Sequence, residues 1–122
     1  PSPQARATVL QDWPRWVNEN LLDYVATMSY TVDFVTFKSY VLSQLSAVSD
    51  PRKLMVGIGA WRLLDVQLAQ QLGYVLEEME LRGTFLFNLD GLMDKGLIDT
   101  VRGMRLTYYP ETAAGTSSRR LP

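Results

Sequence analysis

Side chains suited to sugar binding follow three short apolar runs in this chain of 122 residues. After the three runs come Met28, Ser29 and Tyr30, then Gly59, Ala60, Trp61 and Arg62, and then Asn88, Leu89 and Asp90. Aromatic faces beside amide and hydroxyl groups match a sugar ring, which has apolar C–H faces and many hydroxyls. We therefore predict a glycan substrate as the partner. The predicted substrate-binding residues are Tyr30, Trp61, Asn88, Met28 and Asp33.

The same residues also have structural interpretations, which the sequence leaves open. Aromatic residues such as Tyr30 and Trp61 pack against their neighbours more often than they bind ligands. Asp33 stands where a helix N-cap is expected, and Asp90 precedes Gly91 as a turn residue often does. Glycoside hydrolysis requires a pair of carboxylic acids, and this sequence offers no convincing pair with one buried member. No catalytic residue is therefore predicted in this chain.

Composition excludes several other kinds of chemistry. The chain has no Cys and no His, so thiolate or imidazole metal sites, disulfides and Ser-His-Asp catalysis cannot be built from it alone. We expect no metal and no cofactor. Twelve Lys and Arg against thirteen Asp and Glu give a net charge of -1, which argues against a nucleic-acid partner. No apolar run approaches the ~18–20 residues that a membrane span needs.

Three continuous apolar runs predict buried strands at residues 22–28, 53–59 and 83–87. None of them alternates cleanly between apolar and polar residues, which is typical of strands buried on both faces in parallel sheets. Gly57 and Gly59 lie inside the second run, which lacks the Lys-Ser/Thr ending of a phosphate-binding loop. We expect these glycines to allow close packing or the approach of a ligand.

Helical periodicity fills the intervals between the runs. One predicted helix follows Asp33 as its N-cap, ends at Pro51, and has the apolar face Phe34, Phe37, Val41, Leu42, Leu45 and Val48. A second is expected over 66–81, with the stripe Leu68, Leu72, Val75, Leu76 and Met79 and Asp65 as its cap. The residues expected on its solvent face are Gln67, Gln70, Gln71, Glu77, Glu78 and Glu80. Shorter helices are predicted at 13–20, with Trp13 and Trp16 in the core, and at 95–104.

The spacing of the runs predicts the architecture. They begin near residues 22, 53 and 83, at intervals of 31 and 30 residues. Such intervals suit right-handed parallel crossovers, and an eight-unit barrel of ~250 residues averages ~31 residues per unit. We therefore expect an α/β fold that is a partial (β/α)8 barrel, its last three β/α units, over residues 1–110, followed by a flexible tail over 111–122. The alternative is a compact three-strand α/β sandwich that stands alone or pairs with a second copy.

Three motifs occur in an informative order along the chain. The first is Gln11-Asp12-Trp13-Pro14-Arg15-Trp16-Val17, followed by Leu21-Leu22-Asp23-Tyr24-Val25 and Met28-Ser29-Tyr30-Thr31. The others are Val56-Gly57-Ile58-Gly59-Ala60 and Gly83-Thr84-Phe85-Leu86-Phe87. Together they resemble the glycosyl-hydrolase-like 10 family over roughly residues 4–107. The sequence departs from the family at Thr27, because the family commonly has a proline before the Met.

The resemblance implies a (β/α)8 barrel that acts on bacterial cell-wall or exopolysaccharide glycans, in an exported or cell-envelope protein. It implies that this chain supplies strands six to eight, with Tyr30 closing the sixth strand and Trp61 following the seventh. The family's acidic segment follows the fourth strand, so the catalytic acid is expected upstream of Pro1. This chain alone is therefore expected to be inactive. The alternative function is a non-catalytic α/β interaction module that self-associates.

Overall fold

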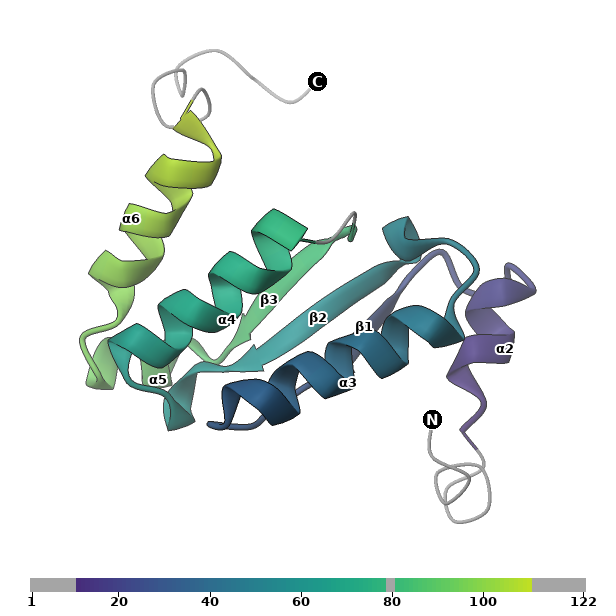
Figure 1. The fold of residues 1–122 in the computed structure, drawn as a ribbon, viewed down its shortest axis with the longest axis horizontal. Helices are drawn as coiled ribbons and strands as arrows, with labels where there is room; N and C mark the ends of the chain where they lie inside the picture. The colour runs from purple at the N-terminus through teal and green to yellow at the C-terminus, as the bar shows by residue number, and fades with distance from the viewer. Residues whose placement is uncertain (1–10, 79–80, 111–122) are drawn as a thin grey trace.

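The computed structural model of the chain describes residues 11–78 and 81–110, and the predicted tail at 111–122 lies outside them. The elements are α2 (Trp13–Asn18), β1 (Val25–Met28), α3 (Phe34–Ala47), β2 (Leu54–Gly59), α4 (Asp65–Glu78), β3 (Gly83–Phe87), α5 (Leu89–Asp94) and α6 (Ile98–Tyr108) (Figure 1). Two short 3-10 turns, η1 (Pro51–Lys53) and η2 (Ala60–Arg62), flank β2.

The three strands form one parallel sheet in the order β1-β2-β3. Thr27 pairs with Val56 across the first pair of strands, and Gly57 pairs with Phe85 across the second. The prediction of three parallel strands, adjacent in chain order, is confirmed. The first strand begins at Val25 rather than at residue 22, because Leu22 and Tyr24 remain exposed before the chain enters the sheet.

Helices α3 and α4 cover one face of this sheet (Figure 1). Two right-handed crossovers that step in the same direction place both connecting helices on the same side. The core lies between these layers, and its fully buried members include Phe37, Val41, Leu54, Val56, Ile58 and Leu68. The sheet and its two crossover helices therefore form a two-layer α/β unit.

The opposite face of the sheet is apolar, and among the described residues Ala26, Met28 and Phe87 on it are exposed to solvent. Because side chains alternate along each strand, the register places Ala26, Met28, Met55, Gly57, Phe85 and Phe87 together on it. We call these six residues the uncovered face. Met28 is 74% exposed and Phe87 is 49% exposed. The outer edges of β1 and β3 also have no strand partner among the described residues.

Helix α3 matches its predicted bounds closely, because Asp33 caps it. The Asp33 carboxylate accepts a hydrogen bond from the Thr36 backbone N–H at 2.7 Å. Phe37 and Val41 are buried as predicted, but Leu42 is 53% exposed and lies off the packed stripe. Trp16 of α2 was also predicted in the core and is instead 37% exposed, while Val17 is fully buried.

Helix α4 differs from its predicted pattern at Gln71 and Asp65, and the predicted Met79 and Glu80 lie outside the described residues. Gln71 was expected on the solvent face, yet only 1% of its surface is exposed. Asp65 is the first residue of the helix rather than its cap. Glu77 is exposed as predicted and accepts a hydrogen bond from the Tyr108 hydroxyl of α6, which joins these two helices.

The helix predicted at 95–104 corresponds to α6, which begins at Ile98 and ends at Tyr108, whereas the short helix α5 before it was not predicted. Gly96 adopts a φ of 67°, a left-handed conformation that glycine accepts at low cost. Its N–H donates to the Met93 carbonyl, and the Leu97 N–H donates to the Leu92 carbonyl. This pair of hydrogen bonds is the Schellman motif that ends a helix, so α5 ends here and α6 begins three residues after the predicted helix start.

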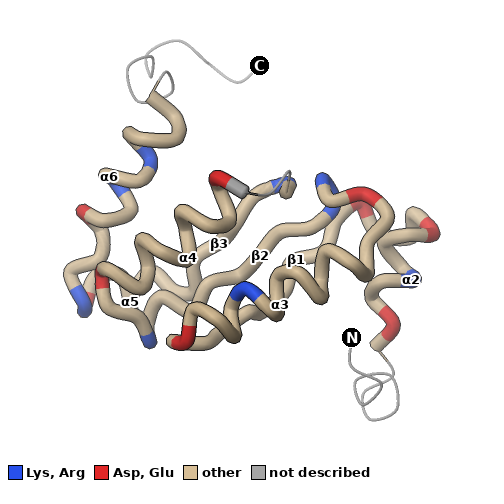
Figure 2. Tube along the Cα trace, in the orientation of Figure 1, with Lys and Arg blue, Asp and Glu red and all other residues tan. Residues whose placement is uncertain are grey.

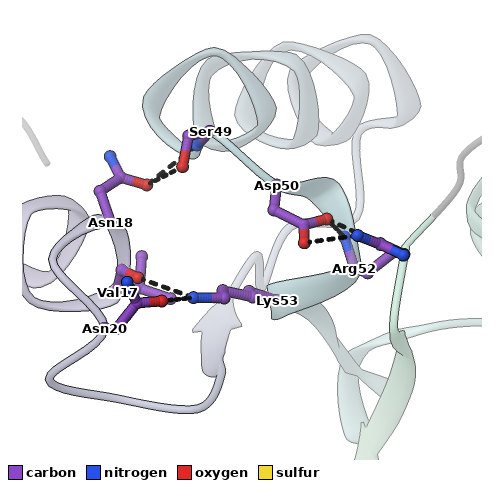
Figure 3. Close-up of polar contacts among 7 residues, drawn as sticks. All are labelled: Val17, Asn18, Asn20, Ser49, Asp50, Arg52 and Lys53. Atoms are coloured by element: carbon purple, nitrogen blue, oxygen red, sulfur yellow. Dashed lines mark hydrogen bonds and ion pairs between the residues drawn. The ribbon is translucent and has the colours of Figure 1, made fainter.

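Polar contacts fix α2 against the amino end of the sheet (Figure 3). The Asn18 amide oxygen accepts from the Ser49 backbone N–H at 2.9 Å, and its NH2 donates to the Ala47 carbonyl at 3.0 Å. The Lys53 ammonium donates to the Val17 carbonyl at 3.3 Å and to Asn20. Charges of both signs are spread over helices and loops, while the three strands carry none (Figure 2). No helix in the described ranges has the length and apolar character of a transmembrane segment.

Candidate functional site

Three aromatic rings meet at the carboxyl end of the sheet, one from each strand. Tyr30 follows β1, Trp61 follows β2 and Phe87 ends β3. The ring centroids of Tyr30 and Trp61 are 4.9 Å apart and nearly perpendicular, at 85°. Tyr30 and Phe87 are stacked at 5.9 Å, and Trp61 meets Phe87 edge-on at 5.5 Å. We call these three rings the aromatic cluster.

Two glycines make room for the indole of Trp61. A Cβ added to Gly59 would lie 2.8 Å from the Trp61 ring, and one added to Gly91 would lie 2.6 Å from the Trp61 Cβ. Gly57 plays a similar part lower in β2, where an added Cβ would lie 2.3 Å from both the Phe85 ring and the Thr27 carbonyl. The expected close packing at Gly57 and Gly59 is therefore observed.

The aromatic cluster is only partly covered by protein. Trp61 is 37% exposed and Phe87 49% exposed, whereas Tyr30 is half-buried. Burial raises the pKa of Tyr30 above its ordinary value of 10.0, so the phenol stays protonated at neutral pH. A protonated phenol both donates and accepts hydrogen bonds. The aromatic cluster therefore offers a ligand both the exposed ring surfaces of Trp61 and Phe87 and the hydroxyl of Tyr30.

Asn88 and Asp33 stand near this end of the sheet, and each caps a helix. The Asn88 side-chain oxygen accepts from the Gly91 N–H at 3.1 Å at the start of α5. The hydrogen bonds from Thr36 lower the pKa of the Asp33 carboxyl below its ordinary 3.8, so this group is ionised at neutral pH. Their predicted contact with substrate remains a prediction. Met28 is the last residue of β1 and lies on the uncovered face, opposite Gly57 of β2.

Two glutamines that sequence reasoning did not single out, the half-buried Gln44 and the buried Gln71, hold the segment around Tyr30. The Gln44 NH2 of α3 donates to Ser29 Oγ at 3.0 Å. The Gln71 NH2 of α4 donates to the Thr31 carbonyl at 2.8 Å. Both glutamines occupy the apolar-stripe spacing of their helices, three residues after Val41 and Leu68 respectively. A polar residue at a stripe position was the signal that could have identified them.

Grooves run along both unpaired sheet edges. The groove beside β1 has a volume of about 860 Å³, and its lining includes Trp13, Trp16, Leu22, Met28 and Tyr40. The groove beside β3 measures about 380 Å³ and lies between α4 and α6, with Leu72, Leu86 and Met104 in its lining. Within the described ranges, no three Asp or Glu side chains gather closely enough to hold a metal ion.

Comparison with known proteins gives no family assignment. No family model matches the chain, and neither a curated protein nor a solved structure matches it.

Proposed function

We propose that this chain is the carboxyl-terminal part of a (β/α)8-barrel glycoside hydrolase that acts on bacterial cell-wall or exopolysaccharide glycans. The observation that carries the proposal is the one-sided sheet: α3 and α4 cover one face, while the opposite face is apolar and uncovered. In a (β/α)8 barrel the helices lie outside and the inner face of the strands is filled by side chains.

The uncovered face is apolar, as the packed interior of a barrel is. Met28, Met55 and Phe85 come from three neighbouring strands, and Gly57 leaves space for the Phe85 ring. Further strands on either side would pair with the open edges of β1 and β3, which removes the exposed edges that natural sheets avoid. The strand spacing of 31 and 30 residues supports the same architecture.

The position of the aromatic cluster supports a glycan substrate. Active sites of (β/α)8 barrels lie at the carboxyl ends of the strands, where Tyr30, Trp61 and Phe87 meet. Partly exposed rings beside a phenol hydroxyl suit the apolar face and hydroxyls of a sugar. The paired carboxylic acids of glycoside hydrolysis would come from the preceding β/α units, since no residue of this chain is assigned a catalytic role.

The test compares two proteins on peptidoglycan glycan strands stripped of peptides. One is the 122-residue chain, and the other adds the coding sequence upstream of Pro1, in which the proposal places the five preceding units. We expect new reducing ends from the longer protein and little or no release from the 122-residue chain. Equal activity of the two proteins would contradict the assignment of catalysis to the preceding units, and no activity in either would remove the hydrolase proposal.

Exposed apolar surface favours a second candidate, a non-catalytic module that self-associates. Met28 and Phe87 are largely exposed on the uncovered face, and a second copy would shield them from water. Solution mass separates the two candidates when it is combined with the upstream coding sequence. A dimer encoded from a start codon directly before Pro1 would favour the module, whereas a frame continuing upstream for ~200 residues, as barrel size demands, favours the hydrolase.

A further inference from the structure

Two glutamines from different helices hold the two neighbours of Tyr30. Gln44 of α3 donates to the Ser29 hydroxyl, and Gln71 of α4 donates to the Thr31 carbonyl. The Gln44 oxygen also accepts from the Thr27 hydroxyl at 2.8 Å. Tyr30 is therefore held on both sides by hydrogen bonds that reach across 15 and 40 residues of sequence.

The hydrogen bonds of Gln71 are incomplete, which makes the residue a poor choice for stability alone. Gln71 is 1% exposed, and its Oε1 is buried without a hydrogen-bond partner among the described residues. A buried acceptor without a partner destabilises the fold, and an apolar side chain of the same size would avoid that penalty. The single bond that Gln71 does make fixes the backbone directly after Tyr30.

We propose that Gln44 and Gln71 are positioning residues that hold the Tyr30 ring in place as one wall of a pyranose-binding platform. This inference rests on the proposed glycan substrate. A wall that is fixed before binding loses less conformational entropy when a sugar ring arrives, so affinity rises without a new contact. The glutamines touch neither the sugar nor any reacting atom; they act through Tyr30.

Gln71→Met provides the first test, since it keeps the side-chain size but removes the donor to Thr31. In the 122-residue chain we expect the nuclear Overhauser contacts between the Tyr30 and Trp61 rings to weaken, with an unfolding temperature equal to or above that of the original chain. Gln70→Met is the matched control, because Gln70 is the exposed neighbour on the same helix. It should leave the ring contacts unchanged.

Gln44 provides a rescue experiment. Gln44→Met removes both the acceptor for Thr27 and Ser29 and the donor to Ser29, and should weaken the same ring contacts. Gln44→Glu keeps the acceptor but loses the donor, and should restore the contacts in part. A role in packing alone would not separate these two variants in this way. Ring contacts that survive both Gln71→Met and Gln44→Met would overturn the inference.

Affinity for a sugar is measured separately, with chitotetraose titrated into the longer barrel protein. We expect Gln71→Met to raise the dissociation constant about three- to tenfold, because the Tyr30 side chain must then be ordered when the sugar binds, and Gln70→Met to leave it unchanged. An unchanged constant in Gln71→Met would overturn the positioning role. If the original protein binds no glycan while the ring contacts still respond to Gln71→Met, the proposed substrate fails and the anchoring of Tyr30 stands.

Discussion

At the scale of single residues, the aromatic cluster depends on two glycines, which have no side chain that would collide with Trp61. Trp61 lies against Gly59 and Gly91, and any Cβ at these positions would overlap it. The close approach at Gly91 involves the Trp61 backbone as well as its side chain, so a rotamer change cannot relieve it. The position of Trp61 at this end of the sheet is therefore set by close packing against two glycines, and no hydrogen bond to the indole is found among the described residues.

Gly91→Ala tests this dependence. The added methyl would lie 2.7 Å from the Trp61 Cα, and overpacking of this kind costs about 1–3 kcal/mol. We expect a lower free energy of unfolding and a shifted Trp fluorescence maximum. Gly103→Ala is the control, since an added Cβ there meets nothing within 4 Å in the exposed part of α6. That control should stabilise the fold by about 0.5–1 kcal/mol.

Asp33 gives a prediction with a defined pH dependence. Its pKa in the folded chain lies below the ordinary 3.8, because its carboxylate accepts hydrogen bonds from Thr36. A lowered folded pKa means that the stabilisation is present above pH ~3.8 and is lost as the pH falls through the lower folded value. Thermal unfolding between pH 2 and pH 6 should show this loss, and Asp33→Asn, which keeps a good cap, should reduce it. An identical pH profile in Asp33→Asn would contradict the assignment.

At the scale of elements, the local sequence predicted the strands, but it did not predict the contacts of Gln44 and Gln71 with the segment around Tyr30. Continuous apolar runs located both β2 and β3. The predicted burial holds only for β2, because β3 has no strand on its outer edge among the described residues and all of its residues remain partly or largely exposed. The stripe of α4 was predicted, but Gln71 was assigned to solvent on residue type alone, since its buried partner lies 40 residues away in sequence. The meeting of Tyr30, Trp61 and Phe87 required the register of the sheet, although Tyr30 and Trp61 were both predicted as site residues.

The sequence pattern placed the start of the last helix at residue 95 and did not predict α5, and the left-handed Gly96 explains why the two helices are separate. Gly96→Ala would place a Cβ in the left-handed conformation, which costs about 1 kcal/mol. We expect a corresponding loss of stability in urea unfolding. Gly96→Asn should lose less, because Asn tolerates this conformation better than Ala. Equal stability of Gly96→Ala and the original chain would show that the Schellman turn does not end α5.

At the scale of the whole molecule, one layer of helices covers a sheet whose other face and both edges are open. The uncovered face is apolar along three neighbouring strands, and the two edge grooves are lined mainly by apolar side chains. A sheet with this surface needs further strands or a second copy. The parallel order, the one-sided helices and the aromatic cluster at the carboxyl end favour further strands of a barrel.

Hydrogen exchange along β1 tests this central claim most directly. The Ser29 N–H donates to Gly57 of β2, and since alternate residues of a parallel strand point to opposite sides, the amides of Ala26 and Met28 point to the open edge. In the 122-residue chain these two amides should exchange much faster than that of Thr27, which points toward β2. In the longer protein we predict that Ala26 and Met28 become as protected as Thr27. If both proteins are monomers and these two amides stay fast in the longer one, no strand pairs with β1 and the barrel is wrong.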